Sequence, residues 1–299
     1  LITDQKYELE YTESIGQITA ALQPLGKDYL EQMRKGFASR WVDVYPSKGK
    51  RSGAYSSGTF LTQPYILLNF HGGYEDMSTL AHEMGHSMHS HMSRSTQPYV
   101  YSDYDIFCAE VASTLNEILL QNYILKQTED PRVKLYLLTE FLEQIRGTVF
   151  RQTKFSEFEQ RIHELAEAGQ PLTADTMSEE YGKIVKKYYG PDYVHDEVVN
   201  SMWIRIPHFY MNFYVYKYAT SYCAASNIAH RIMAGEPGAV EAYLKFLSSG
   251  SSKYPIDLLK EAGVDMTTPK PYEDGMKIFK DLLDQAETLV DQMKPPGGQ

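Results

Sequence analysis

The spacing of apolar residues predicts helices near the start of the chain, followed by one short extended region. Apolar positions recur at helical spacing from about Tyr11 to Ala38, and the helix is broken near residues 24–26 by Pro-Leu-Gly. Residues 41–70 lack this helical spacing. Glycine and proline there separate short stretches such as GAYSSGTF and QPYILLNF, which are typical of strands. We therefore expect a small sheet in this region and nowhere else.

From residue 74 onward the apolar pattern is helical almost to the end. It predicts helices over about 78–91, 105–126, 132–168, 174–189, 207–234, 238–248 and 272–293. No repeat, low-complexity segment or long linker interrupts the chain. The predicted fold is mainly α, as one domain over 1–299 with a helical lead-in (1–40), a small sheet (41–70) and a helical core (74–294).

Composition and charge narrow the possible partners. A formal net charge of −10 argues against a nucleic-acid-binding surface, which needs clustered basic residues. No apolar run is long enough to cross a membrane, and the first residues lack the basic start and apolar stretch of a secretory signal. Two cysteines are too few for a disulfide scaffold. We expect a cytoplasmic protein that binds neither nucleic acid nor membranes.

The segment His82-Glu83-Met84-Gly85-His86 indicates a metal site. Two histidines four residues apart lie on one face of a helix, one turn apart, so both imidazoles can reach a single ion. The glutamate between them is placed to accept a proton from a water activated by the metal, which is the H-E-x-x-H pattern of zinc peptidases. A His-rich amphipathic helix is the alternative, but these polar groups would be costly on a core-facing side without a partner.

A catalytic zinc ion takes three protein ligands and leaves a position for water. The preferred third ligand is Glu110, an acid within a small and apolar stretch of the next predicted helix, which an antiparallel arrangement would bring back to the first. Its competitors are Asp103, Asp105 and Glu117, one of which we expect to steady a ligand from behind. Three further histidines lie off the face of the first pair or in poor geometry: His71, His89 and His91.

The chain resembles the oligoendopeptidase F group of the thimet-oligopeptidase-like zinc metallopeptidases, in its catalytic C-terminal half. The resemblance lies in WVDVYPSKGKRSGAYS, PYILLNF, TLAHEMGHSMHS, FCAEVAST and IPHFYMNFYVYKYATS. It implies a Zn²⁺ ion held by His82, His86 and Glu110, with Glu83 as general base. The domain over 1–299 would then be a zinc-peptidase catalytic domain that hydrolyses internal bonds of oligopeptides.

The resemblance also gives a role to residues late in the chain. A histidine followed by tyrosines binds the scissile carbonyl oxygen in the family, and here His208 matches this histidine. The matching tyrosines would be Tyr214 and Tyr218, which share a face of the predicted helix with Tyr210 and Tyr222. Core packing is the alternative for any one of the 24 tyrosines.

Family members are longer and carry an N-terminal helical half, so we expect such a half as a partner of these residues. The strand PYILLNF either pairs with an extended peptide substrate or is an ordinary central strand.

Two other functions stay open. One is a non-catalytic helical peptide-binding protein with a degenerate metal site, and the other is a zinc dipeptidase or carboxypeptidase with the same ligands.

Overall fold

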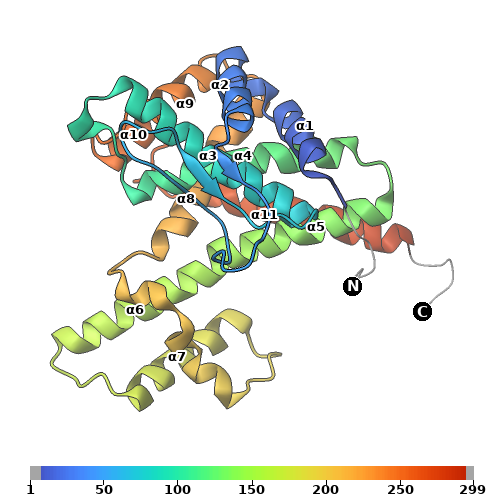
Figure 1. Cartoon of the computed structure of the whole chain (residues 1–299). Helices are drawn as coiled ribbons and strands as arrows, with labels where there is room; N and C mark the ends of the chain where they lie inside the picture. The colour runs from blue at the N-terminus through green and yellow to red at the C-terminus, as the bar shows by residue number, and fades with distance from the viewer. Residues whose placement is uncertain (1–7, 294–299) are drawn as a thin grey trace. The chain divides into compact units, whose positions relative to one another are not determined.

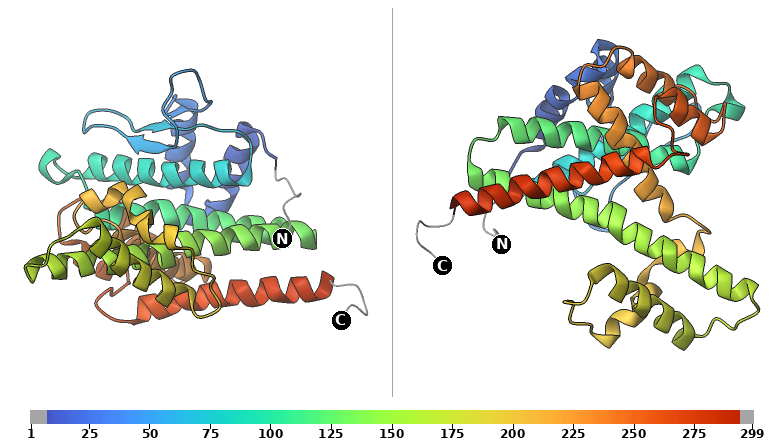
Figure 2. Two further views of the ribbon diagram at one scale, coloured as in Figure 1. Left: turned by 90° about the horizontal axis from the view of Figure 1, so that it is seen from below. Right: turned by 180° about the vertical axis from the view of Figure 1, so that it is seen from behind.

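The computed structural model describes residues 8–293, which form helices and one small sheet (Figures 1 and 2). The α-helices of these residues are α1 (Tyr11–Ala21), α2 (Lys27–Ala38), α3 (Tyr74–Thr96), α4 (Ile106–Gln127), α5 (Pro131–Ile145), α6 (Arg151–Glu167), α7 (Ala174–Tyr189), α8 (Tyr216–Met233), α9 (Ala239–Leu247), α10 (Pro255–Glu261) and α11 (Lys270–Met293). The strands are β1 (Val42–Asp43), β2 (Tyr55–Ser57) and β3 (Tyr65–Leu67). The predicted fold class, mainly α with a small sheet, is confirmed, and the sheet precedes α3, the helix on which a metal site was predicted.

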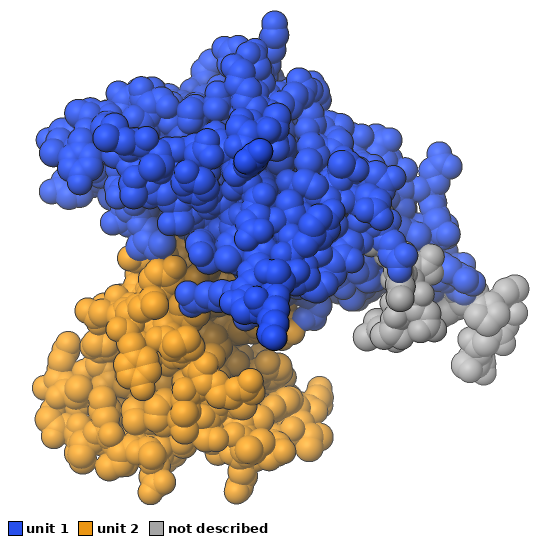
Figure 3. All heavy atoms as spheres, viewed as in Figure 1, with its two compact units in different colours: residues 1–143, 221–299 blue, residues 144–220 orange. Residues whose placement is uncertain are grey.

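Shorter helical turns connect these elements. The turns η1 (Gln23–Leu25), η2 (Tyr99–Tyr101), η4 (Glu197–Arg205) and η5 (Pro207–Tyr210) are 3₁₀-helical, and η3 (Arg146–Phe150) is π-helical. Figure 3 shows the chain divided into two compact units, residues 1–143 with 221–299, and residues 144–220. No helix among residues 8–293 is both long enough and apolar enough to span a bilayer.

Helices α3 and α4 form the centre of the first unit and pack along each other (Figure 1). Most of α4 is buried on all sides, because its sequence is apolar or small around the whole helix. It begins at Asp105, whose carboxylate accepts a hydrogen bond from the Phe107 N–H at 2.7 Å. Helices α1, α2 and α9 also pack on this pair, so the two central helices are held from several sides.

The sheet lies against α3 (Figure 2). The hydroxyls of Ser56 in β2 and Ser87 in α3 are 2.8 Å apart. The strand order is β1-β3-β2, with β1 parallel and β2 antiparallel to β3. Strand β3, from PYILLNF, is therefore the central strand. Both of its edges are paired, so the prediction that it adds an extended peptide is wrong and the alternative of a central strand is confirmed.

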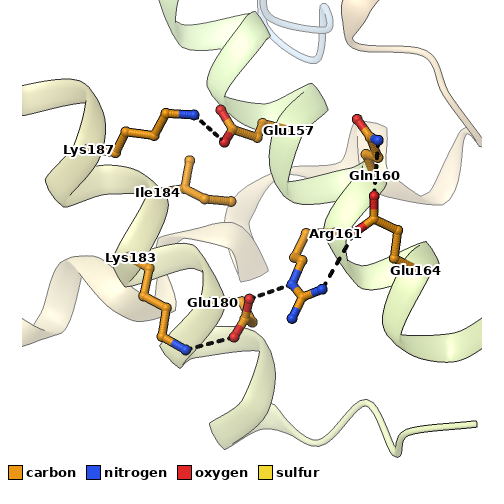
Figure 4. A pocket seen from close by; sticks show the side chains of 8 residues that line it. All are labelled: Glu157, Gln160, Arg161, Glu164, Glu180, Lys183, Ile184 and Lys187. Atoms are coloured by element: carbon orange, nitrogen blue, oxygen red, sulfur yellow. Dashed lines mark hydrogen bonds and ion pairs between the residues drawn. The ribbon is translucent and has the colours of Figure 1, made fainter. Parts of the chain in front are cut away.

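The second unit is built on α6 and α7 around an apolar cluster that includes Phe155, Phe158 and Val185. Beside this cluster, a hollow of about 390 Å³ between the two helices is lined mostly by charged side chains (Figure 4). Arg161 pairs there with Glu180 at 2.7 Å. Exposed ion pairs contribute about 0–1 kcal/mol each, so the apolar cluster is the main support of this unit.

Three predicted helices differ from those observed. Helix α3, Tyr74–Thr96, is longer than the expected helix over 78–91, and the expected helix over 132–168 consists of α5, η3 and α6 in succession. The expected helix over 207–234 is wrong in its first part, because α8 begins only at Tyr216. Residues before it form η5 and an irregular turn in which Phe213 has a φ of 53°. Helix α10 was not predicted.

Candidate metal centre and active site

Helix α3 presents His82 and His86 side by side, as the four-residue spacing predicts. Their Nε2 atoms are 3.2 Å apart, and the ring centroids are separated by 4.8 Å. Each side chain is largely shielded, with 26% and 16% of its surface exposed. The two imidazoles therefore point one nitrogen each at a common position.

Glu110 reaches the same position from α4. Its Oε2 atom lies 3.3 Å from His82 Nε2 and 3.5 Å from His86 Nε2. The hydroxyl of Ser113, one turn further along α4, donates a hydrogen bond to the same carboxylate oxygen at 3.0 Å. Among the residues that the structure describes, His82, His86 and Glu110 form the one group of three metal-ligand side chains whose donor atoms lie within 4.8 Å of one another.

A glycine inside α3 lets the two helices come this close. A Cβ atom at Gly85 would lie 2.7 Å from the carbonyl oxygen of Ala112 and 2.7 Å from the Cα of Ser113. Such distances are shorter than side-chain carbons tolerate against a fixed backbone, so a larger residue would push α4 away from α3. Gly85 precedes His86 in α3 and packs on the α4 backbone two to three residues after Glu110, so it helps bring the histidines and Glu110 together although it carries no donor.

The donor set fits a tetrahedral zinc ion. Zinc bonds to nitrogen and oxygen are about 2.0–2.2 Å long, so ligand atoms at corners of a tetrahedron lie about 3.3–3.6 Å apart. The three observed separations are 3.2, 3.3 and 3.5 Å. Two imidazoles and one carboxylate also match the ligand types of catalytic zinc sites with an open fourth position.

Charges around the cluster are strongly coupled. Burial alone lowers the pKa of His82, but the carboxylates of Glu117 and Glu110 outweigh it and bring this pKa well above its usual range. Burial raises the pKa of Glu110, while its contacts with His82 and His86 outweigh burial and hold it well below its usual range. A cation at this position would replace the protons of the imidazoles as the partner of the Glu110 carboxylate.

Glu117 supports the cluster from behind. Its Oε2 atom lies 3.2 Å from Nδ1 of His82, and its Oε1 atom accepts a hydrogen bond from the Ser78 hydroxyl at 3.4 Å. Glu117 thus contacts the nitrogen of His82 that does not face Glu110. One of the acids that competed with Glu110 was expected to contact a candidate ligand in this way, and Glu117 contacts His82.

Glu83 is buried next to the cluster, with 6% of its surface exposed. Its Oε2 atom has no hydrogen-bond partner among the described residues. Burial is the largest cause that raises the pKa of this carboxyl, and the nearby His82 and His86 act in the opposite direction. A buried carboxyl with a free oxygen is suited to exchange a proton with a small molecule in the site.

The other candidates have different surroundings. Asp103 faces Arg94 at 3.5 Å, and Asp105 caps α4. Among the remaining histidines, His89 is stacked on the Tyr104 ring at 3.6 Å, and the His91 ring lies 5.7 Å from that of Trp41. His71 is exposed and donates its backbone N–H to Asp76. None of these side chains belongs to the three-donor group.

His208, Tyr214 and Tyr218 lie in the second unit and contact one another. The His208 and Tyr214 rings are stacked with centroids 5.5 Å apart, and the Tyr218 hydroxyl donates to the Tyr214 hydroxyl at 3.4 Å. The predicted stripe of tyrosines on one helix face is wrong, because α8 begins after Tyr214. Tyr210 is 92% exposed, and Tyr222 is buried at 3% exposure.

Sequence reasoning did not single out Gly85, Ser113 or Asn116. Asn116 is fully buried and donates a hydrogen bond from its amide to the carbonyl of Ala81 at 3.1 Å, which ties α4 to the turn that carries His82. A glycine in the middle of a helix is unfavourable without a packing reason, so Gly85 was a detectable signal. Ser113 lies one turn after Glu110 on the same helix and was overlooked, whereas Asn116 could not have been found because its partner lies on another helix.

Known proteins resemble this chain along almost its whole length. Residues 7–278 match the model of peptidase family M3. The chain is 49% identical over 294 residues to oligopeptidase PepF of Bacillus subtilis, covering 98% of the chain and 44% of that relative. It is 43% identical over 291 residues to the chromosomal oligoendopeptidase F of Lactococcus lactis subsp. cremoris, covering 97% of the chain and 48% of the relative.

A crystal structure of oligoendopeptidase-F from Enterococcus faecium superposes with a TM-score of 0.72 at 37% identity. The superposition covers 96% of this chain and 45% of that one. The chain thus spans about half the length of the curated relatives it matches. Taken with the His-Glu-His helix and its glutamate partner, these matches show that the chain belongs to peptidase family M3.

Proposed function

We propose that these residues are the catalytic part of a zinc-dependent endopeptidase that hydrolyses internal bonds of oligopeptides. The observation that carries the proposal is the convergence of His82, His86 and Glu110 at tetrahedral separations, with the buried Glu83 beside them. The names of the relatives, oligopeptidase and oligoendopeptidase F, support the substrate class.

His82, His86 and Glu110 would hold the ion, and Glu117 would keep the His82 ring turned toward it. When bound, zinc lowers the pKa of a water molecule and polarises the peptide carbonyl. Glu83 takes a proton from the attacking water and later delivers it to the leaving amine. Its burial supports this role, since a carboxyl with a raised pKa takes up a proton more readily than an exposed one.

His208 and the tyrosines act on the carbonyl oxygen in this proposal. Their ring N–H and hydroxyl groups are donors that can stabilise the oxyanion formed when water attacks. The family resemblance assigns this role, and the mutual contacts of His208, Tyr214 and Tyr218 support their acting as one cluster. No covalent bond between enzyme and peptide is required.

The metal part of the proposal is tested by zinc content. We expect one zinc per chain in the purified protein and strong loss in Glu110→Gln, because the substitution removes the carboxylate charge from the ligand set. Glu129→Gln is the control, since Glu129 is an exposed acid just after α4. Unchanged zinc in the Glu110 variant would move the third-ligand role to another residue.

The peptidase part is tested with peptides blocked at both ends. Cleavage at internal bonds supports an endopeptidase, whereas cleavage that requires a free carboxyl terminus would show a carboxypeptidase. A dipeptidase would cleave only unblocked dipeptides. The assay compares these 299 residues alone with the same residues joined to the remaining segment of the Bacillus subtilis relative. Bound zinc without turnover in either form would favour the alternative of a peptide-binding protein.

A further inference from the structure

The segment between η5 and α8 has a strained backbone. Phe213 has a φ of 53°, which lies in the left-handed region that residues with side chains rarely adopt. Such a conformation persists only where surrounding contacts hold it, and it is common near functional groups. Here Phe213 directly precedes Tyr214, whose ring is stacked on that of His208.

Glu159 of α6 provides the contact at the strained residue. The backbone N–H of Phe213 donates a hydrogen bond to Glu159 Oε1 at 2.8 Å. Only 1% of Glu159 is exposed, and its Oε2 atom has no hydrogen-bond partner among the described residues. A carboxylate is costly to bury, and among the described residues the Phe213 N–H is the hydrogen-bond donor to this one, with the charge of His163 as a smaller favourable influence. Its role in the fold is therefore the hydrogen bond to Phe213.

Neighbouring residues of α6 contact η5 and the segment between η5 and α8 through aromatic rings. The His163 ring, one turn after Glu159, lies 4.6 Å from the Phe213 ring. One turn before Glu159, the Phe155 ring packs against Phe209 at 5.8 Å. Positions 155, 159 and 163 share one helix face. This face thus contacts the chain just after His208, at Phe209, and just before Tyr214, at Phe213.

We propose that Glu159 is a positioning residue: by accepting the Phe213 N–H it fixes the left-handed turn and so keeps Tyr214 stacked on His208. The expected effect of Glu159 on catalysis rests on the proposed function of His208 and Tyr214. Its effect on the positions of the His208 and Tyr214 rings is independent of that function. Glu159 itself is not assigned any contact with substrate.

Two variants of Glu159 separate its hydrogen bond from its charge, and a third variant is the control. Glu159→Gln keeps an oxygen acceptor of nearly the same shape, whereas Glu159→Leu removes it. Glu164→Ala is the control, because Glu164 is an exposed residue on the same helix that pairs with Arg161. The geometry is measured from the ring signals of His208 in histidine-labelled protein by NMR, since stacking on Tyr214 shifts them. Activity is measured as kcat and KM.

We expect Glu159→Leu to move the His208 signals and to lower kcat by roughly 10- to 100-fold with little change in KM, because misplaced groups lose catalytic alignment. Glu159→Gln and Glu164→Ala should stay close to the wild type. An unmoved His208 signal in a folded Glu159→Leu protein would overturn the proposal. So would an equal loss in Glu159→Gln, since the acceptor is retained there.

If Glu159→Leu unfolds the chain, the same substitution is tested in a protein that also carries Phe213→Gly. Phe213→Gly can adopt the left-handed conformation without strain. Glu159→Leu should therefore cost less in the Phe213→Gly background, in both thermal stability and the His208 signals. An equal cost in both backgrounds would contradict the proposal. If no form of the protein cleaves peptides, the NMR result still decides the geometry, and only the proposed function fails.

Discussion

The Nδ1 atom of His82 lies 3.2 Å from Oε2 of Glu117, while Nε2 of the same ring faces Glu110 at 3.3 Å. The two acids come from α4, two turns apart, and hold opposite nitrogens of one imidazole. A carboxylate on the far nitrogen fixes the ring orientation and raises its basicity as a ligand. In the proposed zinc site, Glu117 would therefore act on the metal through His82.

Glu117→Gln should weaken zinc binding by roughly 10-fold or more, because the negative charge behind His82 is lost while the fold is kept. The measurement is competition for zinc against a chromophoric chelator. The exposed Glu129→Gln serves as the matched control. An affinity equal to that of the control would show that Glu117 has no influence on the ligand.

Gly85→Ala should destabilise the protein by about 1–3 kcal/mol and reduce zinc affinity, since the added Cβ meets the backbone of α4 at 2.7 Å. Gly16→Ala is the control, because Gly16 lies in α1 with nothing within 4 Å of an added Cβ. That substitution should stabilise the helix by up to about 1 kcal/mol. Urea unfolding measures both, and equal stability of the two variants would refute the close-packing argument.

His89 should make the fold sensitive to acid. Burial is the main cause that lowers the pKa of this histidine to about 3, with a smaller contribution from His86. The unfolded chain takes up the proton near pH 6.5, so the folded state loses stability as pH falls from about 6.5 toward 3. Between pH 6.5 and 5 the loss due to His89 is about 1.5 kcal/mol.

His89→Phe removes this titration and keeps a ring against Tyr104. The wild type should therefore lose more stability than the variant between pH 6.5 and 5, as measured by urea unfolding. His230→Gln, at an exposed histidine, should behave like the wild type. Parallel losses in the wild type and His89→Phe would contradict the expected linkage.

His208→Ala, Tyr214→Phe and Tyr218→Phe should each lower kcat, by up to roughly 100-fold, and change KM little. Their hydrogen bonds would strengthen as the oxyanion forms. Steady-state kinetics on one blocked peptide measures the split between kcat and KM. Tyr210→Phe is the control, since Tyr210 is 92% exposed. A rise in KM with unchanged kcat would point to substrate positioning.

Local patterns predicted what depends on local geometry. The pairing of His82 with His86 follows from one turn of helix, and so do most helix positions. Glu110 reaches the two histidines only because α4 packs on α3. The sequence suggested its place in the candidate site only by showing an acid within an apolar stretch. Zinc as the metal, the substrate, the cytoplasmic location and the roles of the site residues stay predictions.

Errors occurred where distant residues decide the backbone. Residues 207–215 have apolar and aromatic spacing that suits a helix, yet Glu159 binds the Phe213 N–H from 54 positions away and holds a turn there. Helix α10 was missed because seven residues give too few apolar positions to show a period. The turn at Phe213 leaves no signal within a short window of sequence, whereas α10 has a local start signal in Pro255 that was overlooked.

Glu83→Gln tests the central claim most directly, since it separates metal binding from chemistry. The variant keeps the size of the side chain but cannot take a proton from water. Zinc content and cleavage of a blocked peptide are measured on the same sample, beside the exposed Glu75→Gln as control. We predict one zinc per chain and no detectable cleavage in Glu83→Gln, with both retained in the control. Undiminished cleavage by Glu83→Gln, or loss of its zinc, would contradict the account.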